Sequence, residues 1–208
     1  MKINLKCETN FSELKNIEKE VFKINSKSVL FIVDMNNGFV KEGALSSERV
    51  KNIIPNVVKT VECFEILKAP IIAFTDWHKK DSVEFEFYPK HCLQGSIEAE
   101  LIDELKVFGD KIKLIKKSTT NAFLEIETEK VINELITEGY ENLVIIGCVT
   151  DICVKQFAIT LRNYLNKINS NIKVIVPINS IETFDTPWHN GDSMNLYALY
   201  DMLLNGIK

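Results

Sequence analysis

The sequence lacks the features that mark membrane-spanning, secreted and nucleic-acid-binding proteins. No apolar run approaches the roughly 20 residues that a bilayer-spanning helix needs, and the first ten residues contain no apolar segment of a secretory signal. The net charge is only −4, and no basic stripe or polybasic tail is present, so we expect neither nucleic acid nor a membrane as a partner. The five cysteines include no Cys-x-x-Cys pair, which argues against a disulfide framework and favours a cytoplasmic protein.

The chain also has no internal repeat, low-complexity tract or flexible linker. Its 208 residues, 46% of them apolar, are enough for one domain with a substantial core. We expect a helix over about Phe11–Phe22 that precedes the first strand as an appendage. The predicted organisation is therefore a helical extension over residues 1–27 and a main domain over residues 28–208.

Short apolar runs rich in β-branched residues alternate with helical patterns along the main domain. The predicted strands are Val29–Val33, Pro70–Phe74, Lys113–Lys116, Leu143–Ile146 and Ile172–Val176. The predicted helices are Glu48–Leu67, Ala99–Phe108, Glu127–Ile136, Ile152–Leu165 and Ser193–Leu204. Ser46 and Ser47 can cap the first of these helices, and Pro55 should kink or split it. The alternation predicts an α/β fold, a mostly parallel sheet with helices on both faces in three layers.

Polar side chains follow four of the predicted strands, where sites form in open α/β sheets. Asp34 follows the first strand, and the third strand ends at Lys116 with Lys117 directly after it. A carboxylate at the end of a buried strand suits proton transfer, although a turn-capping role for Asp34 is an equal alternative. Either lysine can be the cation that keeps Asp34 ionised, because alternation along a strand directs only one of them into the site.

Cys153 follows the fourth strand, at the start of a predicted helix. A thiol beside the first N–H groups of a helix is near the positive end of the helix dipole, which lowers its pKa and makes it a nucleophile. The alternative is a small buried core cysteine. The polar residues at the neighbouring strand ends favour the nucleophile.

A candidate metal site follows the second strand. Asp76 and His78 are two residues apart in an extended segment and thus share a face. His91 follows in a long irregular segment that also contains Glu84 and Glu86, so the site would have two histidines and further carboxylates. Histidine and carboxylate ligands suit Zn²⁺, Mn²⁺ or Fe²⁺, although scattered polar loop residues are the alternative. We interpret His189, beside Trp188, as structural.

Taken together, these stretches resemble the isochorismatase-like cysteine hydrolases, and within them the nicotinamidase branch. The resemblance covers the chain from about Val29 onward. Residues 33–39 are similar to the family's aspartate motif, residues 117–123 to its lysine motif, and residues 147–153 to its nucleophile motif. Residues 75–78 and 88–95 resemble the metal site of nicotinamidases. The spacing selects Lys117 over Lys116 and makes Glu84 resemble an extra carboxylate ligand that some members add.

The resemblance implies a roughly six-stranded sheet, an isochorismatase-like hydrolase fold and a catalytic triad of Cys153, Asp34 and Lys117. It also implies a cis peptide bond between Cys148 and Val149, with the N–H groups of Val149 and Cys153 forming an oxyanion hole. The implied reaction is deamidation of a small carboxamide, nicotinamide first, through a thioester. Zinc is the first choice for the metal, and a homo-oligomer is expected because family members are commonly dimers or tetramers.

Three positions depart from the nicotinamidase pattern and put the substrate in doubt. Asn36 and Gly38 replace a glutamine and an acid in the aspartate motif, and Tyr88 replaces a tryptophan that walls the pyridine ring. Phe39, Trp77 and Tyr88 are the candidate ring walls, with ordinary core packing as the alternative for each. The competing functions are hydrolysis of another small amide or ureido compound and non-catalytic binding of a metabolite or partner protein.

Overall fold

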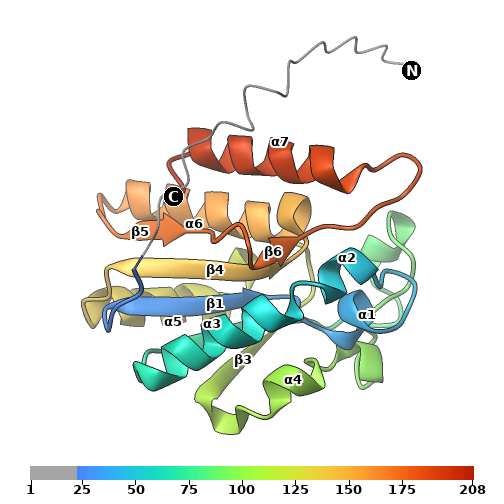
Figure 1. Ribbon diagram of the computed structural model, residues 1–208, viewed down its shortest axis with the longest axis horizontal. Helices are drawn as coiled ribbons and strands as arrows, with labels where there is room; N and C mark the ends of the chain where they lie inside the picture. The colour runs from blue at the N-terminus through green and yellow to red at the C-terminus, as the bar shows by residue number, and fades with distance from the viewer. Residues whose placement is uncertain (1–22) are drawn as a thin grey trace.

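The computed structural model describes residues 23–208, and within them the chain folds around a six-stranded, all-parallel sheet (Figure 1). The strand order is β3-β2-β1-β4-β5, and the short β6 pairs with β4. The strands are β1 Ser28–Val33, β2 Ile71–Asp76, β3 Ile112–Lys117, β4 Asn142–Cys148, β5 Lys173–Ile175 and β6 Ile181–Glu182. The predicted α/β fold is confirmed. The helix expected over about Phe11–Phe22 lies outside the described residues.

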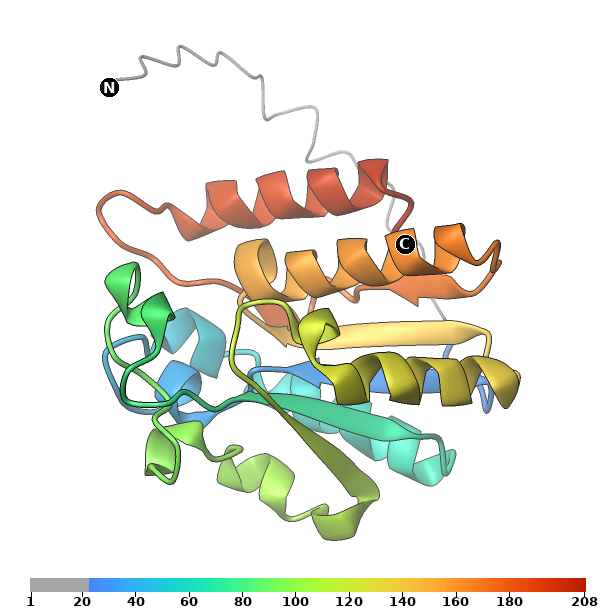
Figure 2. The same cartoon turned by 180° about the vertical axis from the view of Figure 1, so that it is seen from behind.

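Helices cover both faces of the sheet, which gives three layers (Figures 1 and 2). One face is covered by α3 and α4, and the other by α5 and α6, with α7 beside α6. The helices are α1 Asn37–Val40, α2 Glu48–Lys51, α3 Ile54–Ile66, α4 Asp103–Lys106, α5 Ile126–Thr137, α6 Lys155–Lys167 and α7 Gly191–Leu204. Among the described residues, no helix is long and apolar enough to cross a bilayer.

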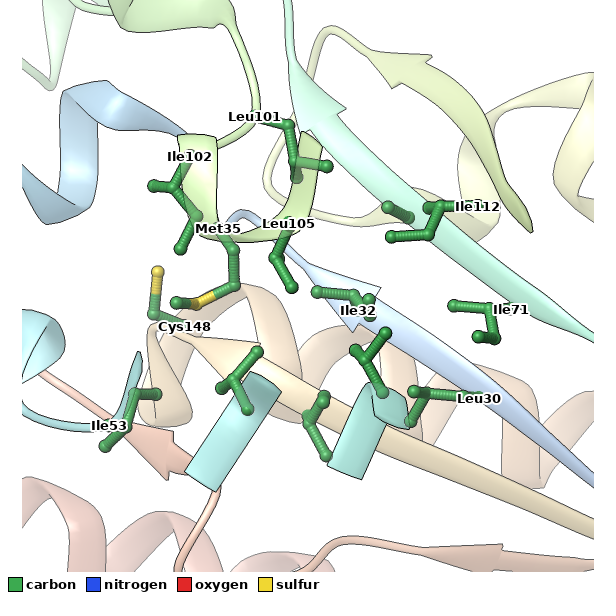
Figure 3. Packing of buried hydrophobic residues seen from close by; sticks show 14 of the residues in the cluster. Leu30, Ile32, Met35, Ile53, Ile71, Leu101, Ile102, Leu105, Ile112 and Cys148 are labelled. Carbon is green, nitrogen blue, oxygen red and sulfur yellow. The ribbon is translucent and has the colours of Figure 1, made fainter. Parts of the chain in front are cut away.

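Strand β1 shows why the sequence folds in this way. All six of its residues are buried, because successive side chains point to opposite faces and each face is covered. Leu30 and Ile32 join the core beneath α3 and α4, where they pack near Ile71 and Leu105 (Figure 3). Val29, Phe31 and Val33, the alternate residues of the strand, enter the core on the other face. A continuous apolar run is thus the signature of this doubly covered strand.

The helix predicted over Glu48–Leu67 is divided into α2 and α3, and Pro55 lies in the first turn of α3. Proline is tolerated there because the first N–H groups of a helix have no intrahelical acceptor. Ser47 occupies the N-cap of α2, but its side chain makes no capping hydrogen bond. The predicted split is confirmed.

The prediction of a helix over Ala99–Phe108 is mostly wrong. Only Asp103–Lys106 is α-helical, after a 3₁₀ turn at Ile97–Ala99. The segment between them is extended, because Ile102 N–H donates to the Met35 carbonyl at 3.0 Å and an isolated bridge joins Asn36 to Leu101. Tertiary hydrogen bonds to the end of β1 therefore override the local helical pattern. Strand β6 was not predicted either, because two residues are too short to show a pattern.

The carboxyl ends of the parallel strands meet at one edge. Asp76 and Lys117 are register partners at the ends of β2 and β3, and Gly147 pairs with Val33 at the ends of β4 and β1. Gly147 has a φ of +116°, and a Cβ there would lie 2.0 Å from the Val33 carbonyl oxygen. Only glycine allows β4 to approach β1 so closely before the chain turns.

Candidate active site

A buried ion pair lies at the centre of this edge. Lys117, which is 1% exposed, places its Nζ 2.8 Å from Oδ2 of Asp34. The same ammonium group pairs with Oδ1 of Asp76 and donates to the Thr119 carbonyl at 3.0 Å. Asp34 has a φ of +52°, an uncommon conformation for a residue other than glycine that indicates a constrained position. The structure therefore brings together residues 34, 76 and 117, which lie at the ends of three different strands.

Alternation along β3 separates the two candidate lysines, as predicted. Lys117 is buried, whereas Lys116 is exposed and places its Nζ 3.6 Å from the centroid of the Trp77 ring. The two side chains thus point to opposite faces of the strand. Lys117 is the lysine that reaches the site.

The buried charges shift one another's ionisation. Burial raises the pKa of the Asp34 carboxyl to about 7, and the opposing charge of Lys117 only partly offsets this effect. Burial alone would lower the pKa of Lys117, but the charges of Asp34 and Asp76 raise it well above its usual value. Asp34 can thus gain or lose a proton near neutral pH, while Lys117 remains an ammonium ion.

Cys153 lies beside the Asp34 carboxyl, in a π-helical turn over Thr150–Val154 that precedes α6. Such turns are frequent at functional sites. The side chain is buried at 7% exposure, and burial raises the pKa of the thiol well above its usual value despite the charge of Lys117. The expectation that the helix start lowers this pKa is therefore wrong for the resting structure, because loss of hydration outweighs it.

Three ligand-type residues form a second cluster next to the ion pair. One ligand atom from each of Asp76, His78 and His91 lies within 4.8 Å of the other two. The Nε2 atoms of both histidines are 3.2 Å from Oδ2 of Asp76. His91 Nδ1 is 2.7 Å from the Pro89 carbonyl, an acceptor that fixes the proton on Nδ1 and leaves Nε2 as a lone-pair donor.

This cluster fits a divalent metal ion. His78 is fully buried, and although its Nε2 lies 3.2 Å from Oδ2 of Asp76, the geometry of this contact is not that of a hydrogen bond, and Nε2 makes no other among the described residues. An unpaired buried ring nitrogen is costly unless a further group satisfies it, and two imidazoles with a carboxylate suit Zn²⁺, Mn²⁺ or Fe²⁺. Glu84 is not part of this tight group. It is half-buried in the 3₁₀ turn Val83–Glu86 and lines the adjacent cavity.

A cavity of about 460 Å³ opens above Cys153 and the candidate metal cluster. Phe39 and Tyr88 line it, together with Val149, Glu84 and His91. The peptide bond between Cys148 and Val149 is cis, and the two residues expected to form the oxyanion hole, Val149 and Cys153, both face this cavity. A pocket of this size accommodates a small molecule.

The third candidate ring wall, Trp77, lies outside the cavity. Trp77 is not among the residues that line the cavity, and it packs instead beneath Lys116 and against the core. Two of the positions that depart from the nicotinamidase pattern also point away from the cavity. Asn36 donates to the Ala99 carbonyl at 2.9 Å, and a Cβ on Gly38 would lie 2.8 Å from Cys92 Sγ. Of the three departures, only Tyr88 faces the cavity.

Sequence reasoning missed the wall that follows β6. Phe184, Asp185 and Thr186 line the cavity, and Arg49 of α2 holds this wall by pairing with Asp185 at 3.1 Å and Glu182 at 3.1 Å. No periodic pattern marks this irregular segment. The residue nearest to this wall that the sequence analysis singled out is His189. In the structure, both of its ring nitrogens face hydrogen-bond acceptors.

The chain is similar to known proteins in sequence and in fold. The family model described as the isochorismatase domain matches residues 28–187. Nicotinamidase 1 of Arabidopsis thaliana is 32% identical over 203 residues, 88% of this chain and 82% of that protein. A probable inactive nicotinamidase of the same plant is 27% identical over 139 residues, 62% of this chain and 69% of that protein.

A solved structure shares the fold. It is the pyrazinamidase of Pyrococcus horikoshii in complex with zinc, with a TM-score of 0.72 and 24% identity. The superposition covers 88% of this chain and 97% of that one. At this identity the likeness shows the arrangement of layers and strands.

Proposed function

The chain belongs to the isochorismatase family of hydrolases, and from that membership we propose that it is a cysteine amidohydrolase acting on a small carboxamide. Nicotinamide is the first candidate substrate, because the curated relative with 32% identity is a nicotinamidase. The observation that carries the proposal is the convergence of Cys153, Asp34 and Lys117 beneath one cavity. A thiol, a base near neutral pKa and a fixed cation are the parts that thiol-dependent amide cleavage needs.

The proposed chemistry has two half-reactions. Asp34 takes the thiol proton as the Cys153 sulfur attacks the amide carbon, and the N–H groups of Val149 and Cys153 stabilise the oxyanion. Asp34 then gives its proton to the departing nitrogen, so ammonia leaves and a thioester remains. Water hydrolyses the thioester to the carboxylic acid and restores the thiol. Lys117 stays charged throughout and favours the ionised form of Asp34.

Asp76, His78 and His91 are the residues that would hold a divalent metal, with Glu84 nearby on the cavity wall. A metal bound there would supply a Lewis acid that can anchor a ring nitrogen and so orient the amide carbonyl over Cys153. The protein's own contribution is the placement of these ligands directly beside the Asp34–Lys117 pair, through the shared residue Asp76.

The pH dependence of activity follows from Asp34. Burial raises the pKa of this carboxyl to about 7, and only its ionised form accepts the thiol proton. We therefore expect kcat/KM to fall as pH decreases through about 7 and to approach a plateau above it. A profile measured with a neutral substrate checks this expectation, and a flat profile between about pH 5 and 8 would contradict Asp34 as the base.

Metal binding should depend on the two clustered histidines and not on the third. Replacing His78 or His91 by alanine removes a ligand, and we expect zinc affinity to fall by more than about 100-fold. His189→Gln is the matched control, because His189 lies outside the cluster, and its zinc affinity should match that of the wild type. Calorimetric titration of the three variants with Zn²⁺ measures the difference. Equal affinities in all three would place the metal elsewhere.

The function itself is tested by ammonia release. The protein is incubated with nicotinamide and with a panel of neutral amides and ureido compounds, each with and without a chelator. Release from nicotinamide that a chelator abolishes supports the proposal. Ammonia release from other amides but not from nicotinamide would favour a related hydrolase with a different substrate, the alternative raised by tyrosine at position 88. No ammonia from any compound would favour a non-catalytic protein, as one of the matched relatives is described.

A further inference from the structure

One wall of the cavity is held by an acid–histidine contact that the proposed chemistry does not use. The wall is the segment over residues 183–190, between β6 and α7, and it contributes Phe184, Asp185 and Thr186 to the cavity. Among these three cavity-lining residues, Phe184 is the aromatic one. The backbones of Thr186 and His189 exchange two hydrogen bonds, at 3.0 and 3.1 Å, and Pro187 between them favours this tight turn.

His189 is fixed on three sides. Its Nε2 lies 2.9 Å from Oδ2 of Asp151, and its Nδ1 lies 3.0 Å from the Phe184 carbonyl oxygen. Its ring stacks on the Phe184 ring, with centroids 3.9 Å apart and planes inclined by 12°. Both nitrogens face acceptors, so the two hydrogen bonds form together only when the ring carries a proton on each nitrogen.

Asp151 connects this contact to the nucleophile. It lies two residues before Cys153 in the same π-helical turn and is buried at 7% exposure. Its second oxygen, Oδ1, accepts a hydrogen bond of 2.5 Å from the Thr183 hydroxyl. The carboxylate thus ties both ends of the wall segment to the turn that carries the thiol.

We propose that His189 is a positioning residue that, through Asp151, fixes Phe184 as the aromatic wall of the substrate cavity. The Phe184 ring is stacked on a ring that is itself bonded to the nucleophile's turn, so the distance between the wall and Cys153 is set by side-chain contacts and not by the loop backbone alone. The substrate is then a flat ring or similarly thin group that Phe184 can cover. This inference rests on the proposed function only in taking the cavity as the substrate site.

The first test is kinetic. His189→Ala should raise KM for nicotinamide by about tenfold, the effect of losing one well-placed aromatic contact, with kcat changed by less than about twofold. Phe184→Ala should do the same. The double variant should show about the same tenfold increase and not about a hundredfold, because His189 acts through Phe184. If adding His189→Ala to the Phe184→Ala variant raised KM by a further factor of about ten, the proposal would be overturned.

A conservative pair at Asp151 makes the test independent of whether His189→Ala folds. The asparagine side chain can accept from Thr183 and donate to His189, so Asp151→Asn should keep KM within about twofold of the wild type. Asp151→Ala removes both bonds and should raise KM by about tenfold. Equal KM values for the two variants would contradict a positioning role.

A second test needs no substrate and therefore separates this inference from the proposed function. Cys153 is labelled with N-methylmaleimide and with the bulkier N-phenylmaleimide, and peptide mass spectrometry gives both rates. In a folded His189→Ala or Asp151→Ala variant, the ratio of the bulky to the small rate should rise severalfold at Cys153 and stay constant at the exposed Cys63. An unchanged ratio at Cys153 would overturn the proposal even in a protein that hydrolyses no amide.

Discussion

Replacing Lys117 by methionine is expected to lower the free energy of unfolding by about 3–5 kcal/mol, the usual cost of removing one partner from a buried ion pair. The Lys117 side chain is 0% exposed and pairs with two carboxylates, Asp34 and Asp76. Methionine has a similar length but no charge, so both acids would remain buried without their cation. Denaturant unfolding of the purified variant measures the loss.

Lys116→Met is the matched control for this prediction. Lys116 is the preceding residue of β3, and its exposed ammonium group lies over the Trp77 ring at 3.6 Å. Loss of that contact should cost less than about 1 kcal/mol. Similar destabilisation in the two variants would show that charge anywhere on this strand matters, and that the pair with Asp34 and Asp76 has no special role.

Replacing Cys153 by alanine is expected to lower turnover by about 10⁴-fold or more, because removal of a nucleophile leaves only the contribution of binding and oxyanion stabilisation. The side chain is small and sits in the turn beside Asp34, so the fold and the zinc affinity should be preserved. Steady-state ammonia release measures the loss. Cys63→Ala, an exposed cysteine on α3, should retain the wild-type rate.

Persisting turnover in Cys153→Ala would show that another group activates the attack, for example a metal-held water beside His78 and His91. The proposed thiol chemistry would then be wrong even though the residues converge. A parallel loss in Cys63→Ala would instead point to a general effect of cysteine substitution on this protein.

Much of the site was predictable because its residues lie at the ends of strands in a parallel sheet. The apolar runs predict the strands, and the carboxyl ends of parallel strands meet at one edge, so Asp34, Asp76 and Lys117 had to lie near one another. The glycine at position 147 allows the close approach of β4 that places Cys153 over the same edge. The meeting of the strand ends follows from period and topology alone, whereas the choice of Lys117 over Lys116 came from the family resemblance and the close approach at Gly147 from the structure.

The parts that failed depend on contacts between distant segments. The helix expected from Ala99 is replaced by extended backbone that bonds to residues 35–37, and no local pattern reports such bonds. The rise in the pKa of the Cys153 thiol reflects burial, which a sequence position does not reveal. Phe184 and Arg49 both line the cavity. Phe184 directly follows the short β6 and Arg49 lies in α2, and neither segment has a distinctive motif.

The proposed mechanism requires a covalent bond between the sulfur of Cys153 and the acyl carbon of a small carboxamide, and mass spectrometry of samples quenched with acid during turnover detects this bond. With nicotinamide, we expect an acyl adduct on the peptide that contains Cys153, formed with release of ammonia and removed by hydroxylamine, which cleaves thioesters. No such adduct should form in Cys153→Ala. Sustained ammonia release with no adduct on that peptide, or an adduct on another residue, would show that Cys153 is not the nucleophile.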